Sequence, residues 1–181
     1  TVDRVTLDDV EWAGLPDREE AGSPNVVGAI ALAAAARALT EIGLDSVAEH
    51  EAALTGYALE RLQSVPQLVL YGETDPLRTA DRLGVIPFNL DPLPHGLVAA
   101  ILGFEAGIGV RHGCFCAQSY VAHLLGVSDA QRLDPRGRRD RPGMVRISLG
   151  AYNTPDDVDA VVEALLRIGR GDFRGRYRRT A

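Results

Sequence analysis

Residues 144–169, MVRISLGAYNTPDDVDAVVEALLRIG, contain a short apolar strand pattern followed by the best-marked helix of the chain. Thr154 is expected to cap this helix and Pro155 to begin it, because the missing N–H of proline costs nothing in the first turn. Asp156 and Asp157 favour the positive end of the helix dipole. An apolar stripe at helical spacing predicts a buried face, made of Val158, Val161, Val162, Leu165 and Leu166.

The N-terminal half predicts two long helices. The first spans about residues 26–41, with Ser23 as its cap and Pro24 as its first residue. The second lies in LDSVAEHEAALTGYALERLQSVP (44–66), where Asp45 or Ser46 is expected to be the cap. The opening stretch, VDRVTLDDVEW, predicts a short strand or one arm of a hairpin.

Short strands and helices then alternate. Strands are predicted in LVLY (68–71), LGVIPFNL (83–90) and IGVR (108–111), and helices in HGLVAAILGFEAG (95–107) and AQSYVAHLLGV (117–127). Pro87 places the second strand at a sheet edge or a bulge, because proline donates no ladder hydrogen bond. This order predicts an α+β sandwich, a small and mostly antiparallel sheet covered by helices.

Composition limits the class of protein. The 181 residues suffice for one domain with a real core, and a net charge of −6 argues against a nucleic-acid partner. The longest apolar run, VVGAIALAAAARAL, is interrupted by Arg37, which argues against a membrane span. Two cysteines make no disulfide framework, so a reducing cytoplasm is the expected location. All 19 basic residues are arginine, so no side-chain amine of this chain can form a Schiff base.

Both cysteines lie in RHGCFCAQ (111–118), and the residues leave several interpretations open. The two thiols could pack as small hydrophobic groups. A zinc site needs more soft ligands than C-x-C and His112 supply, and a Cys114–Cys116 disulfide would close a strained ring. The position after a strand, beside Arg111 and His112, favours a reactive thiolate instead.

Two further residues have a structural and a functional interpretation. Arg146 interrupts an apolar strand; such an arginine is usually a sheet-edge or surface residue, but its planar fork also suits a substrate carboxylate. Ser23 marks a helix start, and helix starts also bind phosphate. Three other histidines, His50, His95 and His123, are assigned no role.

Five stretches in order carry a family resemblance: EAGSPN, YALERLQSVPQLVLYG, RLGVIPFNL, GIGVRHGCFCA and VRISLGAYNTPDDVDAVVEALLRI. They resemble the C-terminal part of class V aminotransferase-fold enzymes, most closely cysteine desulfurases and selenocysteine lyases, over roughly residues 20–168. The resemblance implies the C-terminal domain of a fold-type I pyridoxal-phosphate enzyme. Residues 1–25 would then be a connector from a large domain absent here, 26–170 the linking helix and small domain, and 171–181 a flexible basic tail.

The resemblance also implies roles for single residues. In these enzymes a loop of the form R-x-G-x-x-C-A carries the nucleophilic cysteine, which places Cys116 at the catalytic position and leaves Cys114 without a role. Arg146 matches the residue that holds the substrate carboxylate, and Arg111, the arginine of the loop motif, is expected to bind substrate as well. Ser23 matches a residue that reaches the cofactor phosphate across a dimer interface. No metal site is expected.

The implied cofactor is pyridoxal 5'-phosphate, attached to a lysine outside this chain. The Cys116 thiolate would attack the sulfur of L-cysteine or a related amino acid, leaving a persulfide and alanine. The implied partners are a second copy in a homodimer and a sulfur acceptor protein. Without the lysine-bearing domain the chain alone is expected to be inactive.

The sequence departs from compact desulfurases in one place. SDAQRLDPRGRRDRPG (128–143) is longer than the corresponding segment of compact desulfurases. The CFC form of the cysteine loop, in addition, resembles the corresponding loop of molybdenum-cofactor sulfurases. Two alternatives therefore stay open: an epimerase or C–S lyase of the same fold in which Cys116 is incidental, and a non-catalytic binding module that uses residues 132–141.

Overall fold

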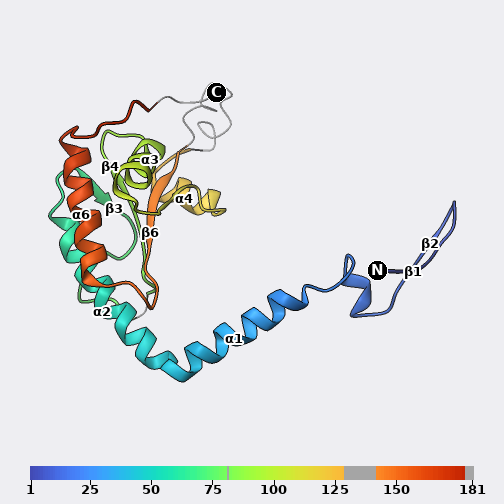
Figure 1. Ribbon diagram of the computed structural model, residues 1–181. Helices are drawn as coiled ribbons and strands as arrows, with labels where there is room; N and C mark the ends of the chain where they lie inside the picture. The colour runs from blue at the N-terminus through green and yellow to red at the C-terminus, as the bar shows by residue number, and fades with distance from the viewer. Residues whose placement is uncertain (81, 129–141, 178–181) are drawn as a thin grey trace. The chain divides into compact units, whose positions relative to one another are not determined.

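The computed structural model describes residues 1–80, 82–128 and 142–177, which form two compact units, Thr1–Leu44 and Asp45–Ala181. In chain order the elements are β1 (Val2–Val5), β2 (Val10–Trp12), the short 3-10 helix η1 (Asp17–Glu19), α1 (Val26–Ile42), α2 (Leu44–Gln63), β3 (Leu68–Leu70), β4 (Val85–Leu90), α3 (His95–Ala106), β5 (Arg111–Gly113), α4 (Gln118–Leu124), β6 (Met144–Ser148) and α6 (Pro155–Gly169) (Figure 1). The insertion predicted at 128–143 lies almost entirely outside the described residues.

The first unit contains a hairpin and a helix. β1 and β2 pair antiparallel, which confirms the predicted hairpin arm. The predicted cap of α1 is wrong: the side chain of Asn25, not Ser23, accepts the Gly28 N–H at 2.9 Å, so the helix begins at Val26 and Pro24 precedes the cap. None of the residues of α1 is buried.

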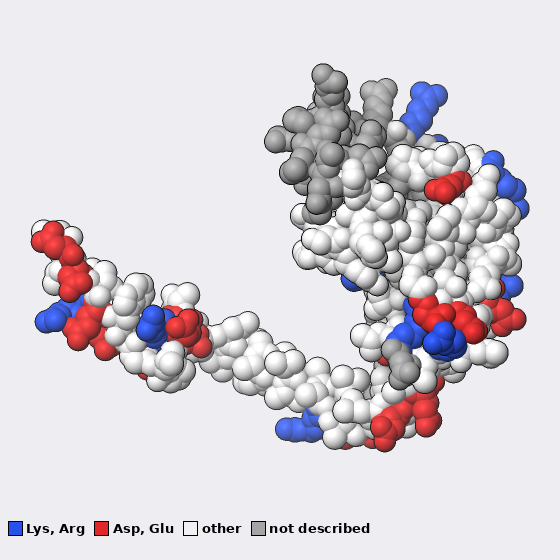
Figure 2. All heavy atoms as spheres, turned by 180° about the vertical axis from the view of Figure 1, so that it is seen from behind, with Lys and Arg blue, Asp and Glu red and all other residues white. Residues whose placement is uncertain are grey.

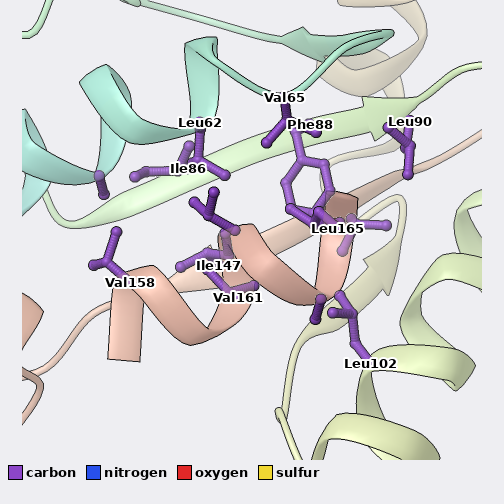
Figure 3. Packing of buried hydrophobic residues seen from close by; sticks show 14 of the residues in the cluster. Leu62, Val65, Ile86, Phe88, Leu90, Leu102, Ile147, Val158, Val161 and Leu165 are labelled. Carbon is purple, nitrogen blue, oxygen red and sulfur yellow. The ribbon is translucent and has the colours of Figure 1, made fainter. Parts of the chain in front are cut away.

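The second unit is a two-layer α+β sandwich, as predicted. Its sheet has the order β3-β4-β6-β5, and every neighbouring pair is antiparallel. Buried residues of α2, α3 and α6 belong to the same core cluster as alternate residues of β4 and β6, so these helices cover one sheet face. The phenyl ring of Phe88 on β4 points toward Leu165 on α6 in the middle of this core (Figure 3).

The helix predicted in residues 144–169 forms as expected. α6 begins at Pro155 after Thr154, and the carboxylate of Asp157 accepts the Thr154 backbone N–H at 2.9 Å. This hydrogen bond and a side-chain hydrogen bond from Asn153 lower the pKa of Asp157. Four residues of the predicted stripe are buried, namely Val158, Val161, Val162 and Leu165.

Three local predictions are wrong. β4 is not an edge strand, since β3 and β6 flank it. The Pro87 carbonyl faces the β3 side, where it accepts the Tyr71 N–H just past the end of β3. The N–H that proline lacks would point to the same side, beyond the end of β3, so no hydrogen bond of the ladder is lost. α2 begins at Leu44, so Asp45 lies in its first turn instead of capping it. The strand predicted at 108–111 lies further along, at Arg111–Gly113.

The segment after α6 contacts α3. The Glu105 carboxylate accepts hydrogen bonds from the backbone N–H groups of Arg174 and Gly175 and from the Tyr177 hydroxyl, at 2.9, 2.7 and 2.8 Å. These hydrogen bonds lower the pKa of Glu105. The structure therefore places residues 174–177 against α3, whereas residues 178–181 lie outside the described residues and the predicted mobility of the tail stays a prediction.

Charge is mixed on the face shown in Figure 2. Arginine and acidic side chains lie interspersed there, and the described residues form no continuous basic surface on that face. Among the described helices none is by itself long and apolar enough to cross a membrane, although α1 and α2 taken together as a bent pair have the length and composition.

Candidate active site

Arg146 and Arg111 lie side by side on neighbouring strands. The register of β5 and β6 makes them direct cross-strand partners, and Pro87 of β4 is the partner of Arg146 on its other side. Directly opposed residues of an antiparallel pair share a sheet face. Because Val145 and Ile147 point into the core, the two guanidinium groups lie on the opposite, outer face of the sheet. The sheet-edge interpretation of Arg146 is wrong, since β6 is an interior strand.

Like charges directly opposite each other in a sheet destabilise it. Within residues 1–80, 82–128 and 142–177 neither Arg111 nor Arg146 forms a salt bridge that would offset this repulsion. Among the described residues, the pair therefore presents a double positive charge on the outer face that no salt bridge offsets. An anion bound there would remove the repulsion and gain two charge-assisted contacts.

The Arg146 side chain is half-buried and incompletely hydrogen-bonded. Its Nε is buried and has no partner among the described residues. Its guanidinium carbon lies 5.2 Å from the centroid of the Phe115 ring, a cation–π contact. Leaving a buried donor without an acceptor costs about 1–3 kcal/mol, and more for a charged group. A protein can tolerate this cost at a position where a bound ligand supplies the missing acceptor. A carboxylate is such a ligand, because its two oxygens match Nε and a terminal nitrogen of the guanidinium group.

The cysteines belong to a tight turn with an unusual backbone. The Ala117 N–H donates to the Cys114 carbonyl at 2.8 Å, and the two central residues, Phe115 and Cys116, have φ of 54° and 60°. Two consecutive left-handed residues closed by this hydrogen bond are typical of a type I' turn, which favours Asn and Gly. Holding a side-chain-bearing residue there costs about 1–3 kcal/mol each.

The two thiols differ in exposure. Cys116 is exposed, whereas Cys114 is half-buried, and both are free. The thiol at the predicted catalytic position is therefore the more accessible of the two. Within the described residues no group of three His, Cys, Asp or Glu side chains is arranged as a metal site.

Close backbone packing holds β5 against the start of β6. A Cβ on Gly143 would lie 2.7 Å from Nε2 of His95 and 2.8 Å from the Gly113 Cα, which is closer than real Cβ atoms approach. Gly113 itself has φ of 106°, which glycine adopts without strain. The Nδ1 atoms of His95 and His112 lie 3.2 Å apart next to this junction.

Two residues near the arginine pair were not singled out from the sequence. Phe115 was only the spacer between the cysteines, and its contact with Arg146 depends on how the turn folds over β6. Asn89 lies on the outer face of β4; its Nδ2 donates to the Gly143 carbonyl at 3.2 Å, while its Oδ1 is buried without a partner among the described residues. An isolated Asn in a strand pattern carries no sequence signal of this kind.

The structure brings three of the four predicted site residues into one region: Arg111 and Arg146 on paired strands, and Cys116 next to the ring that Arg146 contacts. Ser23 belongs to the other unit, where it is exposed and makes no hydrogen bond with a described residue. The shallow pocket between α3 and α6, which includes Glu105 and Arg167, contains none of these residues.

Comparisons with known proteins identify the family of the chain. The family model for aminotransferase class-V matches residues 1–161. The chain is 42% identical over 159 residues to a cysteine desulfurase of Salmonella newport strain SL254, an alignment that covers 88% of the chain and 34% of that protein. The chain thus spans about a third of the length of the curated relatives it matches.

Solved structures show the same fold. A cysteine desulfurase from Thermococcus onnurineus NA1, in its apo form, aligns with a TM-score of 0.68 at 32% identity, covering 94% of this chain and 38% of that one. The cysteine desulfurase CsdA of Escherichia coli, in an S-sulfonic acid form, aligns with a TM-score of 0.66 at 28% identity, covering 96% of this chain and 37% of that one. The chain therefore belongs to the aminotransferase class-V family, with a fold like that of cysteine desulfurases.

Proposed function

We propose that this chain is the C-terminal domain of a pyridoxal-phosphate-dependent cysteine desulfurase, in which Cys116 is the persulfide-forming nucleophile and Arg146 binds the substrate carboxylate. One observation carries the proposal: the half-buried Arg146, whose Nε has no partner within the part of the chain that the structure describes, contacts the turn that contains the exposed thiol. A carboxylate acceptor and a sulfur-directed nucleophile are thereby held at one site. The curated relatives are named cysteine desulfurases, which supports the same substrate class.

The residues of this chain fit the cofactor only in part. Pyridoxal phosphate, when bound, supplies an electron sink that stabilises negative charge on the substrate carbon skeleton. The chain contains no lysine, so the lysine that holds the cofactor must come from outside it. What the chain offers is the exposed Ser23 hydroxyl for the phosphate and the arginine pair for the carboxylate of the amino acid. By itself the chain is then inactive.

The chemistry assigned to this chain is a sulfur transfer. The carboxylate of L-cysteine accepts hydrogen bonds from Nε and a terminal nitrogen of Arg146, with Arg111 adding a second positive charge. The Cys116 thiolate attacks the substrate sulfur, so that an S–S bond forms and the substrate C–S bond breaks. The carbon keeps the electron pair and takes up a proton, which leaves alanine and a persulfide on Cys116. The persulfide sulfur is then passed to a thiol of an acceptor protein.

Replacement of each cysteine in the complete polypeptide that contains residues 1–181 tests this proposal. With dithiothreitol present to reduce the persulfide, Cys116→Ala should abolish the release of alanine and sulfide from L-cysteine, whereas Cys114→Ala, the matched control, should retain it. An epimerase or C–S lyase of this fold would keep its turnover after Cys116→Ala. A binding module would show neither turnover nor a pyridoxal absorbance band.

The assembly follows from the same proposal. We place Ser23 at a homodimer interface, where its hydroxyl donates to the cofactor phosphate of the second copy. We also propose that the protein is cytoplasmic. Ser23→Ala should then weaken cofactor retention without changing the dimer, measured by dialysis and by sedimentation velocity. A monomeric holoenzyme would contradict this assembly.

A further inference from the structure

Phe115 joins the two halves of the candidate active site. It is the covalent neighbour of Cys116, and its ring lies 5.2 Å from the guanidinium carbon of Arg146. Through this one side chain, the group proposed to bind the carboxylate contacts the turn that carries the nucleophile. The contact crosses from β6 to the loop after β5.

The turn that contains Phe115 and Cys116 has an unfavourable backbone. Phe115 and Cys116 both have left-handed backbone conformations, which are unfavourable for residues other than Gly, Asn and Asp. The hydrogen bond from the Ala117 N–H to the Cys114 carbonyl closes the turn. The attraction between the Arg146 cation and the face of the Phe115 ring opposes the backbone strain.

A carboxylate at Arg146 changes this balance. The attraction between a cation and an aromatic ring is electrostatic, so it weakens when an anion neutralises the cation. The buried Nε has no partner among the described residues, so Arg146 keeps hydrogen-bonding capacity for such an anion. The opposed Arg111 adds positive charge on the same face and favours anion binding there.

We infer that Phe115 is a positioning residue that couples carboxylate binding at Arg146 to the conformation of the Cys116 turn. With Arg146 unliganded, the ring holds the strained turn closed; with a carboxylate bound, the hold weakens and the turn opens, which lets Cys116 move toward the substrate sulfur. The inference rests on the proposed function for the identity of the carboxylate. It concerns a separate property, the dependence of the turn on that carboxylate.

Hydrogen–deuterium exchange of the Ala117 amide tests the coupling directly, because this N–H closes the turn. The complete polypeptide is studied with sodium propionate, a carboxylate without amine or sulfur, and with propionamide as the uncharged control at equal ionic strength. In the wild type we expect propionate to accelerate the exchange about 3- to 10-fold, the factor that corresponds to losing one cation–π contact. Propionamide should have no effect.

Variants separate coupling from a merely structural role. Phe115→Leu should exchange rapidly without propionate and ignore it, whereas Phe115→Tyr, which keeps an aromatic face, should restore the response. Phe104→Leu is the matched control, since Phe104 is an exposed phenylalanine on α3, and it should behave as the wild type. Circular dichroism of each variant identifies any loss of fold. If Phe115→Leu does not fold, the response of Phe115→Tyr to propionate alone decides whether the coupling exists.

The inference is overturned if Phe115→Leu still responds to propionate, or if the wild type does not respond. Persulfide formation from L-cysteine is measured in the same wild-type sample. A propionate response without persulfide would refute the proposed function and leave the coupling in place. Persulfide without a propionate response would refute the coupling alone.

Discussion

Arg111 and Arg146 are direct cross-strand partners of β5 and β6, and within the described residues no acidic side chain forms a salt bridge with either. Two like charges in this position lower the stability of the sheet. They lie on the sheet face that α2, α3 and α6 do not cover. The pair lies beside the strained turn of Cys116. An unfavourable charge pair and an unfavourable backbone in one region support the proposed ligand site, because neither contributes to stability.

Loss of the Arg146 fork should weaken substrate binding. Arg146→Gln is expected to lower kcat/KM for L-cysteine about 10- to 100-fold, since hydrogen bonds to a charged group contribute about 1.5–3 kcal/mol. The effect should fall mainly on KM, measured by steady-state kinetics of alanine release. Arg170→Gln, at the exposed end of α6, serves as control and should leave both constants unchanged. Equal kinetics for the two variants would contradict the carboxylate role.

A methyl group at Gly143 should disturb the junction of β5 and β6. Gly143→Ala would place its Cβ 2.7 Å from Nε2 of His95 and 2.8 Å from the Gly113 Cα. Such overpacking should lower the free energy of unfolding by about 1–3 kcal/mol. Hydrogen–deuterium exchange measures this loss as reduced protection of the β6 amides. Gly103→Ala on α3 is the matched control: nothing lies within 4 Å of its Cβ, so the helix should gain up to about 1 kcal/mol. The reverse order of the two stabilities would refute the packing argument.

The core should respond strongly to truncation of Phe88. The ring has 0% exposure between β4 and α6, so Phe88→Ala is expected to cost about 3–5 kcal/mol. Urea titration with exchange protection of α6 amides measures the loss. Leu77→Ala provides the comparison, because Leu77 is 92% exposed and its truncation should change the protection little. A small effect of Phe88→Ala would place the core elsewhere.

The contact of the C-terminal segment with α3 should depend on acid pH. Hydrogen bonds from Arg174, Gly175 and Tyr177 lower the pKa of Glu105 below its ordinary 4.5. A lowered folded-state pKa means that the contribution is complete above about pH 4.5 and is lost as the pH falls through the folded-state value. Exchange protection of the Arg174 and Gly175 amides should fall in that window.

Glu105→Gln should remove this protection at neutral pH, because the neutral amide offers a single acceptor where the carboxylate offers two. Glu163→Gln, an exposed position on α6, is the control and should keep it. Protection that persists in Glu105→Gln would show that Phe173 and Tyr177, which pack edge to face at 6.2 Å, hold the segment without the carboxylate.

Local signals in the sequence predict α6 and the antiparallel sheet well. A proline, two acids and an apolar stripe specify one helix and its buried face, and the core follows from that face. The position of Pro87 is not predictable in this way, since it depends on where β3 ends opposite β4. The cap of α1 is ambiguous for a related reason: Ser23 and Asn25 are both good caps, and only the backbone conformation selects Asn25.

The candidate site is predictable only in part. Arg146 is visible in the sequence because it interrupts an apolar strand, whereas Cys116 is singled out from Cys114 only by the resemblance to the R-x-G-x-x-C-A loop. Their proximity comes from strand register, which pairs Arg111 with Arg146, and from the left-handed turn that turns Phe115 toward the guanidinium group. Neither register nor an unfavourable backbone conformation has a reliable signature in a single sequence.

The most direct test of the account is the mass of the peptide that carries Cys114 and Cys116, after the complete polypeptide has been incubated with L-cysteine under non-reducing conditions. We predict a gain of one sulfur atom, assigned by fragmentation to Cys116 and absent from Cys116→Ala. A pyridoxal absorbance band together with turnover, but with no added sulfur on Cys116, would contradict the central claim.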